Sequence, residues 1–105
     1  MFIKVSADGR VTLEEHDNFR AFKLVIAGEA GALDAARRAV AGLAELPDAD
    51  TAWVSEPALR RRPEVAADAE WQQSLGGMID KARPHGWIDD ARKAIKAHIE
   101  WTGAA

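Results

Sequence analysis

Cysteine is absent from this 105-residue chain, and so is tyrosine. Without cysteine, neither disulfide bonds nor thiolate metal sites can stabilise the fold. No apolar run approaches the ~18–20 residues that cross a bilayer, and Asp8-Gly9-Arg10 interrupts the apolar start too early for a signal peptide. Positive charge is not in excess, because 14 Lys and Arg face 17 Asp and Glu, which gives a net charge of −3. We therefore expect a soluble, cytoplasmic protein that binds neither nucleic acid nor membranes.

The rest of the composition is that of an ordinary globular domain. Hydrophobic residues make up 48% of the chain and charged residues 30%, which excludes a disordered tail or a fibre. The length supports one core but not two, so we expect a single domain over residues 1–105. A small core needs large rings, which favours burial of most of the four tryptophans. These are Trp53, Trp71, Trp87 and Trp101.

Two alternating segments at the N-terminus predict a β-hairpin. Residues 2–6 and 10–15 each place their apolar side chains on one face. Asp8-Gly9 lies between them, and this pair favours a tight hairpin turn because both positions accept a positive φ.

The middle of the chain predicts a strand–helix–strand unit. Residues 20–27 alternate as a strand does, and their aromatic and β-branched content favours that interpretation over a helix that would also fit. From 31 to 46 the apolar residues recur every three or four positions, which predicts an amphipathic helix ending at Pro47. Residues 51–55 are β-prone, so the two strands would lie parallel with a right-handed crossover.

Two further helices are predicted in the second half. An apolar stripe at helical spacing runs from 64 to 83, and Gly76-Gly77 inside it leaves both a kinked and a straight helix open. Pro84 ends this helix, and residues 87–101 then show two adjoining helical stripes. The predicted fold is α+β: a small mixed sheet, made of the N-terminal β-hairpin plus a βαβ unit, is covered by three helices. The last two helices form an antiparallel pair.

None of the short motifs points to a specific chemistry. The segment 28–31, Gly-Glu-Ala-Gly, lacks the G-x-G-x-x-G pattern of nucleotide-binding loops, so a plain turn before a helix is favoured. The three histidines lack the spacing of metal ligands, and we expect no metal site and no cofactor. The arginine run 60–62 could contact an anion, but Glu56 and Glu64 flank it and favour a solvated surface.

The stretch 81–90 is the most suggestive one for a site. It combines a titratable ring, a flexible glycine, a large aromatic ring and two carboxylates, which suits proton transfer or ligand stacking. The simpler interpretation, which we favour, is a connector between helices. A pocket, if present, should lie where the 64–83 helix meets the last one, with His85 and Trp87 at its mouth. The candidate ligand-binding residues are His85, Trp87, Trp71, His98 and Trp101.

For function, we expect a small non-catalytic binding or interaction domain. It would self-associate, as a homo-oligomer, or dock a partner through Trp-rich C-terminal helices, because tryptophan is enriched at interface hot spots. The alternative is a pocket for a small-molecule ligand, or a cofactor-free acid–base enzyme that uses His85 or His98 between tryptophan walls. The sequence assigns no catalytic residue, and leaves the enzymatic question open while favouring a protein that is not an enzyme.

Overall fold

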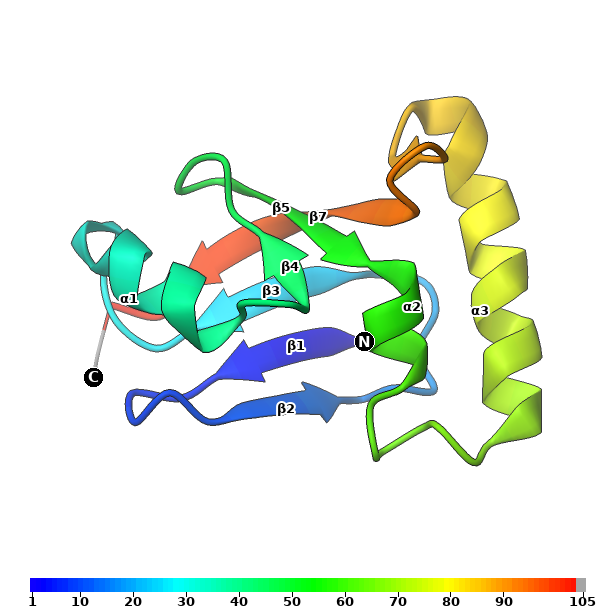
Figure 1. The fold of residues 1–105 in the computed structure, drawn as a ribbon, viewed down its shortest axis with the longest axis horizontal. Helices are drawn as coiled ribbons and strands as arrows, with labels where there is room; N and C mark the ends of the chain where they lie inside the picture. Colours follow the sequence, from blue (N-terminus) through cyan, green and yellow to red (C-terminus); the bar gives the residue numbers. More distant parts are fainter. Residues whose placement is uncertain (104–105) are drawn as a thin grey trace.

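A curled mixed sheet of seven strands forms the centre of the computed structural model, which describes residues 1–103 (Figure 1). Six strands follow the order β2-β1-β3-β7-β5-β4, and the short β6 pairs with β7 beside this path. The strands are β1 (Phe2–Val5), β2 (Val11–Glu14), β3 (Lys23–Ile26), β4 (Ala44–Glu45), β5 (Thr51–Ser55), β6 (Ile88–Asp89) and β7 (Ala94–Trp101). The helices are α1 (Leu33–Ala39), α2 (Glu56–Arg60) and α3 (Ala69–Ala82), with short 3₁₀ turns η1 (Ala30–Ala32) and η2 (Arg83–His85).

The N-terminal hairpin is confirmed. β1 pairs antiparallel with β2, in a register that sets Ile3 opposite Leu13. Gly9 in the connecting turn has a φ of 84°, the left-handed conformation that glycine adopts without strain. Local turn chemistry and alternation therefore suffice to specify this part of the sheet.

Residues 20–27 and 51–55 also contain the predicted strands, but they do not make a βαβ unit. β3 lies parallel to β1 on one side and to β7 on the other. β5 pairs antiparallel with β7, so β3 and β5 run in opposite directions with β7 between them. The predicted parallel unit is wrong because the last segment of the chain inserts a strand between its two strands.

The prediction of a helix over 87–101 is also wrong. In β7, residues 95, 97 and 99 are buried while 96, 98 and 100 are exposed, which is the period of two of a strand. The isoleucines also fit a helical spacing, but pairing with strands on both sides outweighs the helix propensity of the alanines. The predicted fold class is thereby corrected: the sheet is larger than the small sheet expected, and a strand takes the place of the second helix of the pair.

The predicted helix over 31–46 is present but short. α1 ends at Ala39, and the chain then turns through Gly42, which has a φ of 84°. The remainder of the predicted helix forms β4, which pairs antiparallel with β5. Pairing at the sheet edge therefore replaces the last helical turns.

The helix predicted over 64–83 is confirmed from residue 69 to residue 82 as α3. It begins after Asp68, whose carboxylate accepts the Trp71 N–H at 3.0 Å, an N-cap contact. It runs through Gly76-Gly77 without a break, so the straight alternative holds, and Pro84 lies in the 3₁₀ turn that follows. No helix among residues 1–103 is long and apolar enough to span a membrane.

The hydrophobic core fills the concave side of the curled sheet. α3 covers one end of it and α1 the other (Figure 1). The sheet contributes the buried residues Ile3, Val5, Leu13, Leu24, Ile26, Ala52, Val54, Ile95, Ala97 and Ile99. Of the four tryptophans only Trp71 is buried, which corrects the expectation that most of them form core. The remaining three are half-buried or exposed.

Candidate functional site

Two of the five predicted ligand-binding residues lie side by side. The rings of His85 and Trp87 stack with their centroids 4.4 Å apart and their planes 18° apart. Trp87 is 48% exposed and is the one large apolar side chain exposed among residues 1–103. Its carbonyl accepts the Lys96 N–H at 2.7 Å, so the β6–β7 pairing extends to Trp87.

The other three lie apart from this ring pair. Trp71 packs in the core, where its Nε1 donates to the His16 carbonyl at 2.6 Å. Trp101 is half-buried at the end of β7, and its Nε1 donates to the Ala49 carbonyl at 2.7 Å. His98 is exposed on the convex face of the sheet. The structure thus brings His85 and Trp87 together and places Trp71 where no ligand reaches it without disrupting the core.

The loop that carries the ring pair is held by one arginine. Arg83 donates to Asp80 at 2.8 Å and to Asp90 at 3.0 Å, which joins the end of α3 to the turn after β6. The hydrogen bonds that Arg83 donates to Asp90 and then to Asp80 raise the pKa of Arg83 above its ordinary value. Gly86, with a φ of 78°, makes the turn between the two rings. The stacked pair is therefore presented on an anchored loop.

Strand pairing aligns Trp87 with three other side chains across the convex face. Lys96 on β7 lies opposite both Trp87 and Trp53 on β5, and Trp53 lies opposite Glu45 on β4. Directly opposed residues of neighbouring strands point to the same face of a sheet. The row therefore reads Trp87, Lys96, Trp53, Glu45, one residue per strand, and we call it the indole row.

The indole row is open to solvent. Lys96 and Glu45 are exposed and Trp53 is half-buried, whereas the neighbours of Lys96 and Trp53 along their strands point into the core. Adjacent strands lie ~4.8 Å apart, so the two tryptophan backbones are about 10 Å apart with a lysine between them. The residues of β1, β3 and β7 on this face are exposed or half-buried apart from Ala94, and none of the described helices covers them.

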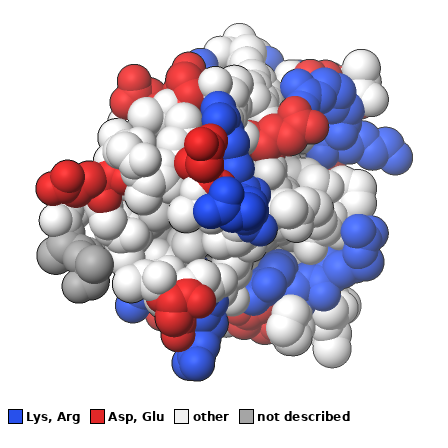
Figure 2. All heavy atoms as spheres, turned by 60° about the vertical axis from the view of Figure 1, so that its left-hand side comes forward, with Lys and Arg blue, Asp and Glu red and all other residues white. Residues whose placement is uncertain are grey.

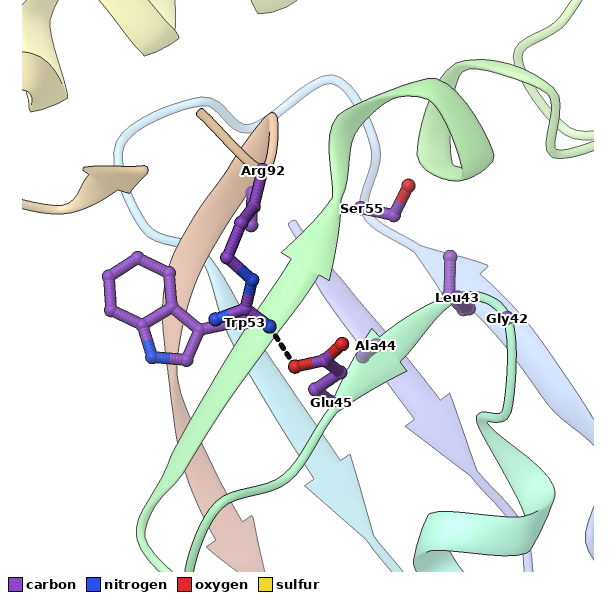
Figure 3. Close-up of a pocket in the computed structure, with 8 residues that line it drawn as sticks. Gly42, Leu43, Ala44, Glu45, Trp53, Ser55 and Arg92 are labelled. Atoms are coloured by element: carbon purple, nitrogen blue, oxygen red, sulfur yellow. Dashed lines mark hydrogen bonds and ion pairs between the residues drawn. The ribbon is translucent and has the colours of Figure 1, made fainter. Parts of the chain in front are cut away.

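Two open hollows adjoin the row at the β4 edge, and Figure 3 draws the residues that line the smaller one. Arg92, in the turn before β7, extends along β5 to an ion pair with Glu45. One hollow, of about 160 Å³, lies toward Gly42 and Ser55, and the other, of about 430 Å³, lies toward Arg37 and Pro47. Both hollows share the lining residues Ala44, Glu45, Trp53 and Arg92. Neither is lined by a predicted site residue.

Two of the polar groups around these hollows are engaged in bonds within the fold. The Ser55 hydroxyl accepts the Ala58 N–H at 3.2 Å and so caps α2. Arg37 donates to the Leu46 carbonyl at 2.9 Å, which fixes its guanidinium at the strand edge. The exposed chemistry that remains is an indole, two cations and a carboxylate, which can stack and pair with charges.

Charges of both signs are interspersed on the convex face and elsewhere. Lys23 and Glu100 form an ion pair of 2.8 Å on neighbouring strands, and the hydrogen bond from Lys23 lowers the pKa of Glu100. The side of the molecule that carries α1 likewise mixes acidic and basic side chains (Figure 2). Cations and anions therefore alternate on both of these parts of the surface.

The arginine run is occupied by internal contacts. Arg60 pairs with Glu56 at 2.9 Å and donates to the Gln72 carbonyl at 2.8 Å. Arg62 pairs with Glu64 at 3.0 Å. These bonds leave two of the three guanidinium groups engaged, and the run serves to join α2 to its neighbours.

Sequence reasoning missed Trp53 as a surface residue of interest. Its partners Lys96 and Trp87 lie far away in the chain, and they and Glu45 all fall in segments that were expected to be helices. The strict alternation from Ile95 to Glu100 was the available signal. Comparison with protein families, with curated proteins and with solved structures finds no match for this chain.

Proposed function

We propose that this chain is a small non-catalytic interaction domain that docks a protein partner through the indole row. The observation that carries the proposal is the alignment of Trp87, Lys96, Trp53 and Glu45 across four neighbouring strands of an uncovered sheet face. We expected the docking surface on two C-terminal helices. The second of these segments forms the strand β7, so the proposed surface is this sheet face.

Energetics favour a docking role for the two indoles. Covering the exposed half of Trp87, about 100 Å², would contribute roughly 2–3 kcal/mol to binding. Trp53 adds a second apolar contact, and Arg92 lies beside it over the same edge. Tryptophan and arginine are the residues most enriched among interface hot spots, and a rim of charged groups around them is typical of docking surfaces.

The alternative, a small-molecule pocket or a cofactor-free acid–base enzyme, draws less support. The imidazole rings of His85 and His98 make no hydrogen bond or ion pair with another described residue, whereas a general base is usually oriented by such a partner. The hollows that adjoin Trp53 contain no histidine. A small ligand at Arg92 and Trp53 is the form of this alternative that the geometry favours.

The proposal is tested by photo-crosslinking from the row. The photoreactive residue p-benzoylphenylalanine replaces Trp87, which keeps an aromatic ring there, and the cells that produce the chain are irradiated. We expect a discrete adduct that disappears when Trp53→Ala is added, because the second indole lies in the same contact. Val25→Ala, a half-buried apolar residue of the convex face away from the row, is the matched control and should leave the adduct in place.

The same photoreactive residue at Arg61, an exposed position beyond α2, should give no adduct. Circular dichroism of each variant verifies that the sheet is intact. Absence of an adduct from position 87, or an adduct insensitive to Trp53→Ala, would contradict a docking role for the row.

A further inference from the structure

Three consecutive members of the indole row, Lys96, Trp53 and Glu45, have a charge order that is complementary to itself. Trp53 stands at the centre of these three, with the Lys96 ammonium one strand away on β7 and the Glu45 carboxylate one strand away on β4. Reversing the order of the three residues therefore exchanges a cation for an anion on either side of the Trp53 indole. In a two-fold symmetric interface centred on Trp53, a group on one side of the axis faces the group on the other side in the second copy, so the Lys96–Glu45 contact would form twice.

The geometry of such a pairing follows from the strands. A two-fold axis along β5, lying between two facing copies, would place the Trp53 indoles against each other. Lys96 of each copy would then face Glu45 of the other, and both side chains are exposed and long enough to span the gap that the convex curvature leaves. Glu45 already receives Arg92 at one carboxylate oxygen, so Lys96 from the second copy would approach its other oxygen.

We propose that the partner docked by the indole row is a second copy of this chain, joined face to face about Trp53. This inference rests on the proposed function and names its partner. Four strands ~4.8 Å apart span under 20 Å, so each copy contributes only a few hundred Å², less than half of a standard interface. The dimer therefore belongs to the weak, reversible class, and should form in the micromolar to millimolar range.

A reciprocal charge swap tests the pairing. Sedimentation equilibrium of the full chain, from about 10 µM to 1 mM, should show a monomer–dimer equilibrium. Lys96→Glu and Glu45→Lys should each weaken the dimer at least about tenfold, because each variant sets two like charges against each other twice. An equimolar mixture of the two variants should restore a dimer that contains one of each, which native mass spectrometry distinguishes by mass.

Two variants with matched charge changes serve as controls. Arg61→Glu and Glu29→Lys alter exposed positions outside the row and should leave the wild-type equilibrium unchanged. Melting temperatures show whether Glu45→Lys, which also removes the ion pair with Arg92, remains folded. If that variant fails to fold, Glu45→Gln replaces it: it should weaken the wild-type contact and leave Lys96→Glu unrescued.

The outcomes separate the two proposals. A wild-type chain that stays monomeric at 1 mM, or a dimer that the charge swaps do not affect, overturns the second-copy proposal. A mixture of Lys96→Glu with folded Glu45→Lys that stays monomeric overturns it too. A cross-link from position 87 to a protein of another mass would overturn it while supporting the docking role, and absence of any cross-link contradicts the docking role itself.

Discussion

The free edge of β2 offers the sharpest test of how side chains stabilise this fold. Glu64 accepts the Leu13 N–H at 2.7 Å, and Arg62 donates to the Val11 carbonyl at 2.8 Å. The two side chains also pair with each other at 3.0 Å, and each is only about a quarter exposed, at 24% and 23%. The ion pair thus occupies backbone groups of β2 that a further strand would otherwise bind.

We predict that Glu64→Ala lowers the free energy of unfolding by about 2 kcal/mol. A hydrogen bond to a charged group contributes ~1.5–3 kcal/mol, and water at the sheet edge recovers part of it. Glu64→Gln keeps an oxygen for Leu13 but loses the charge, so its loss should be nearer 1 kcal/mol. For a chain of this length the two losses correspond to melting-point decreases of roughly 8 and 4 °C.

The contribution of Glu64 to the free energy of unfolding should depend on pH in a defined direction. Partial burial acts to raise the pKa of Glu64, but hydrogen bonds from Arg62 and Leu13 outweigh it and hold that pKa below the ordinary value. The stabilisation is therefore complete at pH 7, and it is lost as pH falls below the ordinary glutamate range and through the folded-state pKa. Glu64→Gln should flatten this part of the acid profile.

Urea unfolding at pH 7 and at pH 3 measures both effects. Glu29→Ala is the control, because Glu29 is exposed and its side chain caps no helix. Equal stability changes for Glu64→Ala and Glu29→Ala, within about 0.5 kcal/mol, would refute the argument from the β2 edge.

Three further predictions concern caps, glycines and surface charge. Asp68→Ala should cost about 1 kcal/mol in urea unfolding, because it removes the N-cap of α3; a change below 0.3 kcal/mol would contradict that role. Gly77→Ala should stabilise the helix by about 0.5–1 kcal/mol since its Cβ meets open space, whereas Gly86→Ala should destabilise by ~1 kcal/mol at its φ of 78°. The melting temperature should therefore rise for Gly77→Ala and fall for Gly86→Ala. If both variants shifted it in the same direction, the different conformational roles given to the two glycines would be wrong. Lys23→Met should raise the pKa of Glu100 toward its ordinary value, as followed by carboxyl NMR titration, and an unchanged titration would show that the 2.8 Å pair does not persist in solution.

Local signals in the sequence predicted the elements that local chemistry decides. Asp8-Gly9 between alternating segments specified the hairpin, and the apolar stripe over 64–83 predicted a helix where α3 runs from Ala69 to Ala82. The final strand could not be assigned in this way, because residues 94–101 alternate and yet also fit two helical stripes. Long-range pairing with β3 and β5 decides between the two, and pairing partners are not visible in a single sequence.

The candidate site was predictable only in part for the same reason. His85 and Trp87 stood out as two rings in a short connector, and the structure stacks them on each other. Trp53 joins them on the surface only because β7 is a strand that places Lys96 between the two indoles. Because residues 87–101 were predicted to be a helix, the interaction surface was expected on the C-terminal segment alone. With β7 as a strand, the candidate surface is a face shared by four strands.

Side chains protect both outer edges of the main sheet path, whereas the convex face of the sheet remains open to solvent. At the β2 edge, Arg62 and Glu64 bind backbone groups that could otherwise pair with a foreign strand. At the opposite edge β4 is only two residues long, and Arg37 donates to the carbonyl of Leu46 just beyond it. Short strands and charged side chains at an edge oppose strand addition. Both outer edges of the main sheet path are thus protected, while the convex face carries the exposed Trp87 and the half-buried Trp53. Association should therefore proceed through side chains on that face rather than by extension of the sheet.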